Sequence, residues 1–266
     1  MTLPPGKATG ATADVPVRDA ATVVLLRDGA RDLEVWLLTR VGGMAFAGGM
    51  SVFPGGRVED ADTELPIVGS SMAQAAARFG TGEREVRGLI GAAARELFEE
   101  TGILLGVPPT LLADAEAARR EVEAGRLDFA ELLRGVGVDI DADALHPWAR
   151  WITPPGEARR YDTRFFLAAL PAGIDARHVT PEAAAAAWVG VRSALAAGER
   201  GTRRLMPPTA ATLTSLAGLG TVAEAIAAAG RRDLTPVSPT LHVTDAGVVA
   251  ALPDGTTFTL PRSTRA

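Results

Sequence analysis

The chain has 266 residues, of which 47% are hydrophobic and 22% charged, and its formal charge of −5 gives a sequence pI of about 5.3. This composition predicts a globular protein with a substantial core, and the acidic balance argues against a nucleic-acid-binding surface. Cysteine is absent, which excludes disulfides, thiolate metal sites and a cysteine nucleophile.

The N-terminal part of the chain shows no targeting or membrane segment. No apolar run approaches the roughly 20 residues that a membrane-spanning helix needs. Residues 1–20 lack the apolar stretch of a signal peptide. We therefore expect a soluble, cytoplasmic protein without membrane contact. Residues 1–18, rich in Pro, Gly, Ala and Thr, are predicted to form a loose tail.

The first regular elements are predicted to form a hairpin. Residues 21–26 are a short apolar run, a turn follows at residues 27–29, and residues 33–39 form a second strand. Between positions 42 and 56, six glycines surround a short apolar stretch. A backbone without Cβ atoms can approach a ligand closely, so this segment is a candidate binding loop.

A long helix is predicted over residues 83–101, after a surface insertion at residues 57–83 that holds a short helix near 71–79. At about 100° per residue, its apolar positions fall on one stripe that faces a core. This stripe consists of Val86, Ile90, Ala93 and Leu97. Gly102 is the expected end of the helix, because Gly enters the left-handed C′ conformation without strain.

Three carboxylates occupy the last turns of this helix. Glu96, Glu99 and Glu100 are spaced i, i+3 and i+4, so they share one face beside the apolar stripe. Three unpaired anions would repel one another and raise their own pKa values. A divalent cation among them removes that conflict, because hard cations prefer oxygen ligands. Arg95 precedes Glu99 by four residues and can hold its carboxylate in place. The alternative is a solvated acidic edge with a single ion pair.

The remainder of the chain mixes helices and strands. Helices are predicted near residues 109–124, 128–135, 191–197, 208–217 and 221–229. Extended segments are predicted at residues 148–151, 162–170 and 187–189. A β-meander closes the chain, with turns at residues 245–247 and 253–255.

Gly55-Gly56 and residues 95–103 (Arg-Glu-Leu-Phe-Glu-Glu-Thr-Gly-Ile) together resemble the Nudix box. The family pattern is Gly, five residues, Glu, seven residues, then Arg-Glu-apolar-x-Glu-Glu-x-Gly-apolar. The second half matches at every defined position. In the first half, Gly56 and Arg95 are 39 positions apart rather than 14, so an insertion of about 25 residues splits the box.

The insertion leaves the earlier glutamate of the pattern displaced. Arg87 stands where the pattern has that glutamate. Glu85 is nearby on the metal side of the helix, but at about 1.5 Å rise per residue it lies roughly three turns from Glu96. We therefore do not assign Glu85 as a metal ligand.

The split box is similar to that of one branch of the family, the coenzyme A diphosphatases of the peroxisomal type and their bacterial relatives. The similarity covers most of residues 20–215 and is carried by residues 46–58, 151–154, 159–166 and 206–209. It implies an α/β Nudix sandwich with a mixed, curved sheet over residues 19–197, including a helical insertion at 107–147. Residues 198–266 would form a helical and β-meander extension, either packed on the core or forming a homodimer contact.

The resemblance also implies an activity. A Nudix hydrolase uses Mg²⁺ or Mn²⁺ to cut the diphosphate of a nucleoside diphosphate linked to another group, and coenzyme A or acyl-coenzyme A is our preferred substrate. ADP-ribose, NADH and capped nucleotides are rival substrates. A non-catalytic nucleotide-binding module and a nearly inactive enzyme-like scaffold are alternatives; the three late glutamates favour the enzyme.

The residue roles that follow from the resemblance are specific. Glu96, Glu99 and Glu100 would hold the metal beside the Gly55-Gly56 loop, with Arg95 positioning them. Glu100 or Glu182 would be the general base, although Glu182 could equally be a charge at a helix N-terminus. A basic cluster that could grip phosphate, or consist of exposed loop charges, is formed by Arg159, Arg160 and Arg164.

Overall fold

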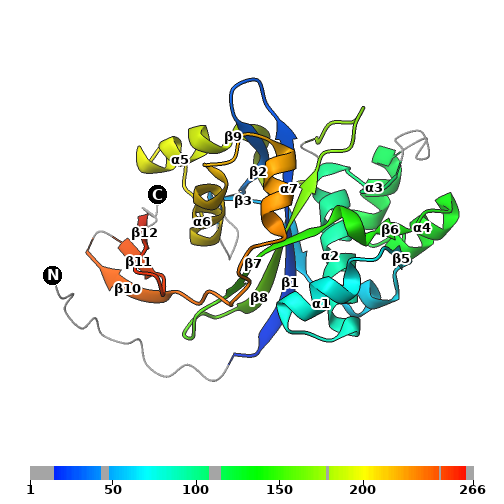
Figure 1. The fold of residues 1–266 in the computed structure, drawn as a ribbon, viewed down its shortest axis with the longest axis horizontal. Helices are drawn as coiled ribbons and strands as arrows, with labels where there is room; N and C mark the ends of the chain where they lie inside the picture. Colours follow the sequence, from blue (N-terminus) through cyan, green and yellow to red (C-terminus); the bar gives the residue numbers. More distant parts are fainter. Residues whose placement is uncertain (1–14, 43–47, 108–114, 178–179, 246, 262–266) are drawn as a thin grey trace.

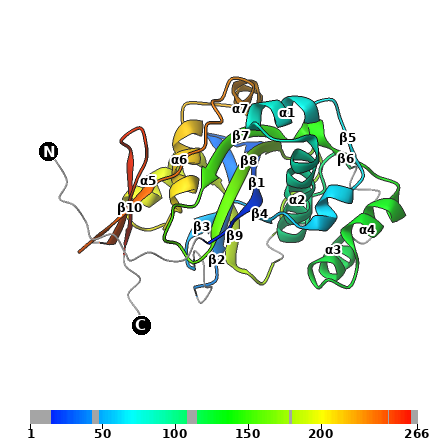
Figure 2. The ribbon, with the colours of Figure 1, turned by 90° about the horizontal axis from the view of Figure 1, so that it is seen from below.

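The computed structural model describes residues 15–42, 48–107, 115–177, 180–245 and 247–261. These residues form a mixed sheet covered by helices on both faces (Figures 1 and 2), which confirms the predicted α/β sandwich. The first strand begins at Val17, so residues 17 and 18, which were predicted to belong to the loose tail, are part of the sheet.

The central sheet has seven strands and is organised around its first strand, β1 (Val17–Asp28). Strand β1 pairs in parallel with β8 and antiparallel with β2 and β4, so the sheet is mixed. The order along the main path is β3-β2-β1-β8-β7, and β9 pairs with β2. The other six strands are β2 (Leu33–Arg40), β3 (Ser51–Val52), β4 (Gly55–Arg57), β7 (His146–Ile152), β8 (Arg160–Ala169) and β9 (Ala183–Gly190).

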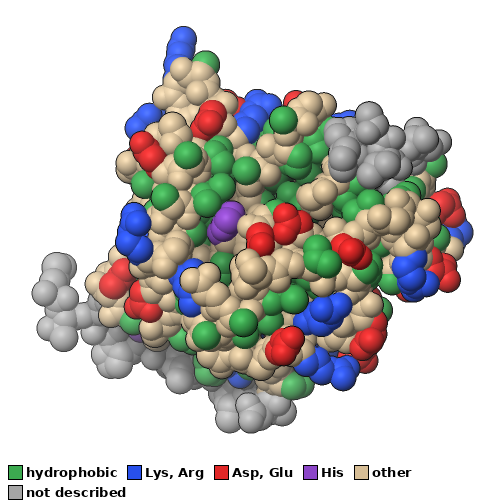
Figure 3. Space-filling model, turned by 45° about the vertical axis from the view of Figure 1, so that its right-hand side comes forward, with side chains coloured by type: hydrophobic (Ala, Val, Ile, Leu, Met, Phe, Trp, Pro, Cys, Tyr) green, Lys and Arg blue, Asp and Glu red, His purple; other side chains and the backbone are tan. Residues whose placement is uncertain are grey.

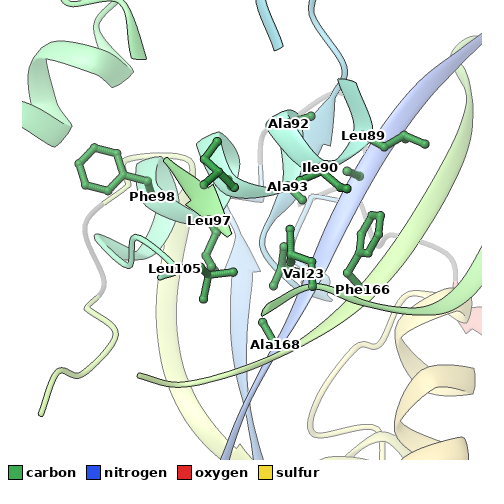
Figure 4. Close-up of a cluster of buried hydrophobic side chains, with 14 of the residues drawn as sticks. Val23, Leu89, Ile90, Ala92, Ala93, Leu97, Phe98, Leu105, Phe166 and Ala168 are labelled. Carbon is green, nitrogen blue, oxygen red and sulfur yellow. The ribbon is translucent and has the colours of Figure 1, made fainter. Parts of the chain in front are cut away.

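The longest helix, α2 (Glu83–Thr101), packs along one face of the sheet and matches the bounds predicted from the sequence. Figure 4 shows its apolar side chains, among them Ile90 and Leu97, facing Val23 of β1 and Phe166 of β8. All of these side chains are buried, so this interface forms the larger core. Three further helices lie on the same side: α1 (Met72–Phe79), α3 (Ala115–Glu123) and α4 (Phe129–Val136).

The two predicted insertions meet one another. Strand β5 (Ile67–Val68) of the first pairs in parallel with β6 (Ile140–Asp141) of the second. A short 3₁₀ helix, η1 (Asp60–Glu64), lies against α2, and a second, η3 (Ala142–Ala144), follows β6. The insertions therefore form one layer beside α2.

The C-terminal region supplies the second helical layer. Helices α5 (Val191–Glu199), α6 (Pro207–Leu216) and α7 (Val222–Ala229) contribute buried residues to a core on the opposite face of the sheet, together with Trp148 and Leu167. The two helices beyond residue 198 thus belong to the sandwich. A separate three-stranded meander follows: β10 (Thr240–Thr244), β11 (Gly247–Ala251) and β12 (Thr257–Pro261).

The surface carries charges of both signs. Figure 3 shows acidic and basic side chains interspersed over one face, with a small group of acidic side chains near its centre. In the described part of the chain, no helix has both the length and the apolar character needed to span a bilayer.

Candidate active site

The C-terminal end of α2 carries the three glutamates. Gly102 ends the helix in the left-handed conformation, with φ of 74°, as predicted. Its N–H donates to the Phe98 carbonyl over 2.8 Å. The last turn of α2 holds no basic residue. Carboxylates are unfavourable at this end of a helix, because the helix dipole already places negative partial charge there. The arrangement is therefore costly for the fold and indicates a functional reason for Glu99 and Glu100.

Strand β4 presents its two glycines to this helix end. The Gly55 N–H donates to Glu100 Oε2 over 3.0 Å. A Cβ atom on Gly56 would lie 2.2 Å from Glu96 Oε1, closer than any real contact of that kind. Both glycines therefore bring backbone directly against the carboxylates, and Gly56 in particular leaves the space that Glu96 occupies.

Burial raises the pKa values of all three glutamates, and neighbouring carboxylates add to the shift. Burial is the main cause for each, and the Glu96 charge raises the pKa of Glu99 and Glu100 further. The pKa of Glu99 reaches about 7, and that of Glu100 lies well above its ordinary value although the Gly55 N–H opposes the shift. Without a further positive charge, the ionised forms of these carboxylates are therefore disfavoured at this site.

Arg95 is the cation in direct contact with this cluster. Its Nη1 lies 2.8 Å from Glu96 Oε1 and 3.5 Å from Glu99 Oε1. Its other donors point away from the glutamates: Nε and Nη2 form a two-pronged ion pair with Asp62, at 2.9 and 3.0 Å. The Asp62 carboxylate comes from η1, in the inserted segment.

Glu182 lies close enough to the cluster for its charge to raise the pKa of both Glu96 and Glu100. Its carboxylate accepts a hydrogen bond of 3.2 Å from Arg40 Nη2, and its side chain is 58% exposed. Arg40 in turn opposes the pKa shift of Glu100. The structure therefore brings Glu182, predicted from its place before β9, to the glutamate site, and adds Arg40 from the end of β2.

The displaced first half of the box has a structural explanation. Arg87, which replaces the expected glutamate, donates from Nε to the Thr63 carbonyl over 3.0 Å and from Nη2 to the Leu65 carbonyl over 2.6 Å. It thus fastens the inserted segment to α2. Glu85 lies at the other end of the helix and binds Arg164 over 2.6 Å. Neither residue reaches the cluster.

The predicted basic cluster is dispersed. Arg164 is buried, at 2% exposure, and its guanidinium pairs with Asp19, Glu85 and Asp162. This environment corrects the expectation that Arg164 grips phosphate, because both terminal nitrogens already face carboxylates. Arg160 donates to the Thr153 carbonyl, and Arg159 is exposed. The strand register puts Arg160 five residues from the level of Gly55, roughly 16 Å along β8.

We expect Arg164→Met to destabilise the fold by about 2–3 kcal/mol, less than the loss of a fully buried pair, because Asp19 and Glu85 stay partly hydrated. Thermal unfolding measures this loss, and KM for a phosphate-rich substrate should not change. The matched control is Arg159→Met, at an exposed arginine, which should leave the melting temperature unchanged. A higher KM for Arg164→Met without a lower melting temperature would show that Arg164 contributes to substrate binding and not to stability.

Asp62 and Arg40 were not identified as site residues from the sequence. Asp62 is one of several acidic residues in the 57–64 stretch, and no spacing rule selects it as the partner of a residue 33 positions away. Arg40 ends an apolar strand and resembles any strand-terminal charge. Only the fold places both beside α2.

The donor chemistry of the cluster fits a divalent cation. Its ligand atoms are carboxylate oxygens, which hard cations prefer, and a bound cation would favour their ionised form, which burial disfavours. Among the described residues, no three acidic or histidine side chains surround one common point. Instead, Glu96 accepts from Arg95 and Glu100 accepts from the Gly55 N–H.

The stability of the metal-free protein should depend on the Glu99 proton. A carboxylate whose pKa is higher in the folded state than in the unfolded state stabilises the fold at low pH, and this contribution is lost as pH rises through the folded pKa. For Glu99 the window runs from 4.5 to about 7. We expect the free energy of unfolding to fall across it, by up to about 1.4 kcal/mol per pH unit from this group.

Urea denaturation in a chelator, at pH values between about 5 and 8, measures this slope. Glu99→Gln should flatten the profile, because it removes the titrating group. If the wild-type and Glu99→Gln profiles run parallel, Glu99 does not titrate with a raised pKa.

An α/β/α sandwich whose longest helix ends in glutamates against a Gly-Gly strand is the architecture of Nudix proteins. The chain belongs to the NUDT19 Nudix domain family, whose model matches residues 84–216, half of the chain.

Individual relatives agree with this assignment. The chain is 32% identical over 210 residues to the acyl-coenzyme A diphosphatase NUDT19 of Gallus gallus, covering 58% of this chain and 55% of that protein. It is 28% identical over 186 residues to the Xenopus laevis protein of the same name, covering 53% of this chain and 48% of that one. The chain thus spans about half the length of these curated relatives.

Among solved structures, a NUDIX hydrolase from Alicyclobacillus acidocaldarius superposes with a TM-score of 0.64 at 27% identity. The match covers 84% of this chain and all of that one. It extends well beyond the Nudix box and so supports the arrangement of both helical layers.

Proposed function

We propose that the protein is a diphosphatase that depends on a divalent metal ion and cleaves the diphosphate of coenzyme A or acyl-coenzyme A. The observation that carries this proposal is the cluster of Glu96, Glu99 and Glu100 packed against Gly55-Gly56. The substrate assignment is supported by the relatives named acyl-coenzyme A diphosphatase.

Different glutamates would bind the metal ion and act as the general base. Glu96, Glu99 and Glu100 would hold the cation, Mg²⁺ or Mn²⁺, which when bound neutralises diphosphate charge and acidifies water. Glu182 is our preferred general base, because its side chain is 58% exposed and reachable by water. Glu100 is only 7% exposed, and one of its oxygens is already held by Gly55.

The remaining groups would bind the substrate. The diphosphate would bind beside the carboxylates that the Gly55-Gly56 strand holds in place. Arg159 and Arg160 remain proposed contacts for a phosphate distant from the cleaved bond, such as a 3′-phosphate. A homodimer and a cytoplasmic location also remain predictions.

A substrate panel tests the function. Coenzyme A, an acyl-coenzyme A, ADP-ribose, NADH and a capped nucleotide are incubated with Mg²⁺ or Mn²⁺, and products are identified by mass. We expect addition of one water to coenzyme A to release 4′-phosphopantetheine and 3′,5′-ADP. Preferential cleavage of ADP-ribose or NADH would reassign the substrate. Tight nucleotide binding without turnover would instead identify a binding module.

A further inference from the structure

The segment inserted into the Nudix box contributes directly to the active site. We propose that Asp62 of this segment is a positioning residue that holds the Arg95 guanidinium and so leaves Glu96 and Glu99 able to take a divalent cation. The proposal rests on the metal-dependent function above and deepens it, because it assigns a role to a part of the chain outside the two halves of the box.

Both carboxylate oxygens of Asp62 pair with Arg95. Its side chain is 1% exposed, and its two oxygens lie 2.9 and 3.0 Å from Arg95 Nε and Nη2. The Glu59 N–H donates to the same carboxylate over 2.8 Å. A two-pronged pair of this kind fixes both the position and the plane of the guanidinium.

Two glycines of helix α2 allow the inserted segment to pack closely against it. A Cβ atom on Gly91 would lie 2.3 Å from the Asp62 carbonyl oxygen, so only glycine allows η1 to approach this closely. One turn earlier, Gly88 faces Val58 and Thr63. Arg87 holds the same segment by two backbone carbonyls. These contacts fix the position of the segment on α2, with Asp62 opposite Arg95.

Asp62 also decides how far Arg95 neutralises the glutamates. Arg95 is 12% exposed, and apart from the Arg57 carbonyl its other acceptors are Glu96 and Glu99. Without the Asp62 charge, the buried guanidinium would have these two carboxylates as its only anionic partners and would compete with a cation for them.

The test is direct Mn²⁺ binding, followed by the electron paramagnetic resonance signal of free Mn²⁺ on the full chain without substrate. Asp62→Asn keeps the shape of the side chain and should weaken Mn²⁺ binding roughly tenfold or more. Asp60→Asn, on the same turn but exposed, is the matched control and should bind as the wild type does.

A second variant separates positioning from docking. Arg87→Met loosens the same segment without touching Arg95, so it should lower the melting temperature and leave Mn²⁺ affinity unchanged. If Asp62 acts through Arg95, Asp62→Asn should cause no further loss of Mn²⁺ affinity in an Arg95→Met background.

Each outcome has a distinct meaning. Equal loss of Mn²⁺ affinity in Arg87→Met and Asp62→Asn would reduce Asp62 to a docking contact, and wild-type affinity in Asp62→Asn would overturn the proposal. A wild-type protein that binds no Mn²⁺ would overturn both this role and the metal-dependent function. Intact Mn²⁺ binding without coenzyme A cleavage would overturn only the substrate assignment.

Discussion

Glu99→Gln should lower turnover by on the order of 10²–10³-fold while leaving the metal-free protein at least as stable as the wild type. The loss follows because a metal ion contributes several kcal/mol of charge stabilisation, and each 1.36 kcal/mol is tenfold in rate. The stability follows from the site itself. Burial and the Glu96 charge both disfavour the Glu99 carboxylate, and a neutral amide removes both costs.

The opposite signs of these two effects make the experiment decisive. Initial rates at saturating Mg²⁺ and thermal unfolding in chelator are measured on the same preparation. Glu131→Gln, at an exposed glutamate of α4, is the control and should change neither quantity. A Glu99→Gln variant with unchanged turnover would contradict the metal role, and one that is inactive because it fails to fold would contradict the electrostatic account.

The sequence was informative where local rules act. The bounds of α2 follow from an apolar stripe and a Gly102 stop, and both are local properties of the chain. The glutamate cluster follows from helical spacing alone. Its pairing with Gly55-Gly56 needed the family pattern, because no local rule brings a strand to a helix end some forty residues later.

The expectation for Arg164 failed for a physical reason. Strand β8 is central and covered by helices on both faces, so Phe165 and Phe166 are both buried and the period of two that marks an exposed face is absent. An arginine in such a strand must find buried or half-buried carboxylates. Asp19 and Glu85 come from distant positions in the sequence and could not be anticipated.

The same limit applies to the C-terminal helices. Their apolar residues predict helices with a buried face, but not which surface buries it. Leu213 and Ala225 complete the core opposite α2, so α6 and α7 form part of a layer of the sandwich. Long-range partners, which also include Asp62 for Arg95, are the part of the fold that spacing does not encode.

Gly56→Ala should lower turnover by about two orders of magnitude and change the melting temperature little, because the new methyl group would occupy the position of the Glu96 carboxylate. The added Cβ atom would lie 2.2 Å from Glu96 Oε1 and 2.4 Å from its Cδ. The end of a side chain can rotate away at modest cost to the fold. Rotation, however, removes Glu96 from Arg95 and from the other two glutamates.

Kinetic constants and melting temperatures of Gly56→Ala are compared with those of Gly218→Ala, where an added methyl group meets nothing within 4 Å. The control should behave as the wild type in both measurements. If Gly56→Ala retains full turnover, Glu96 does not need its present position for catalysis, and the close approach of β4 to α2 serves packing alone. If it instead unfolds at a much lower temperature with normal turnover per folded molecule, the methyl group has displaced backbone and left the Glu96 carboxylate in place, which would contradict the expected rotation of that side chain.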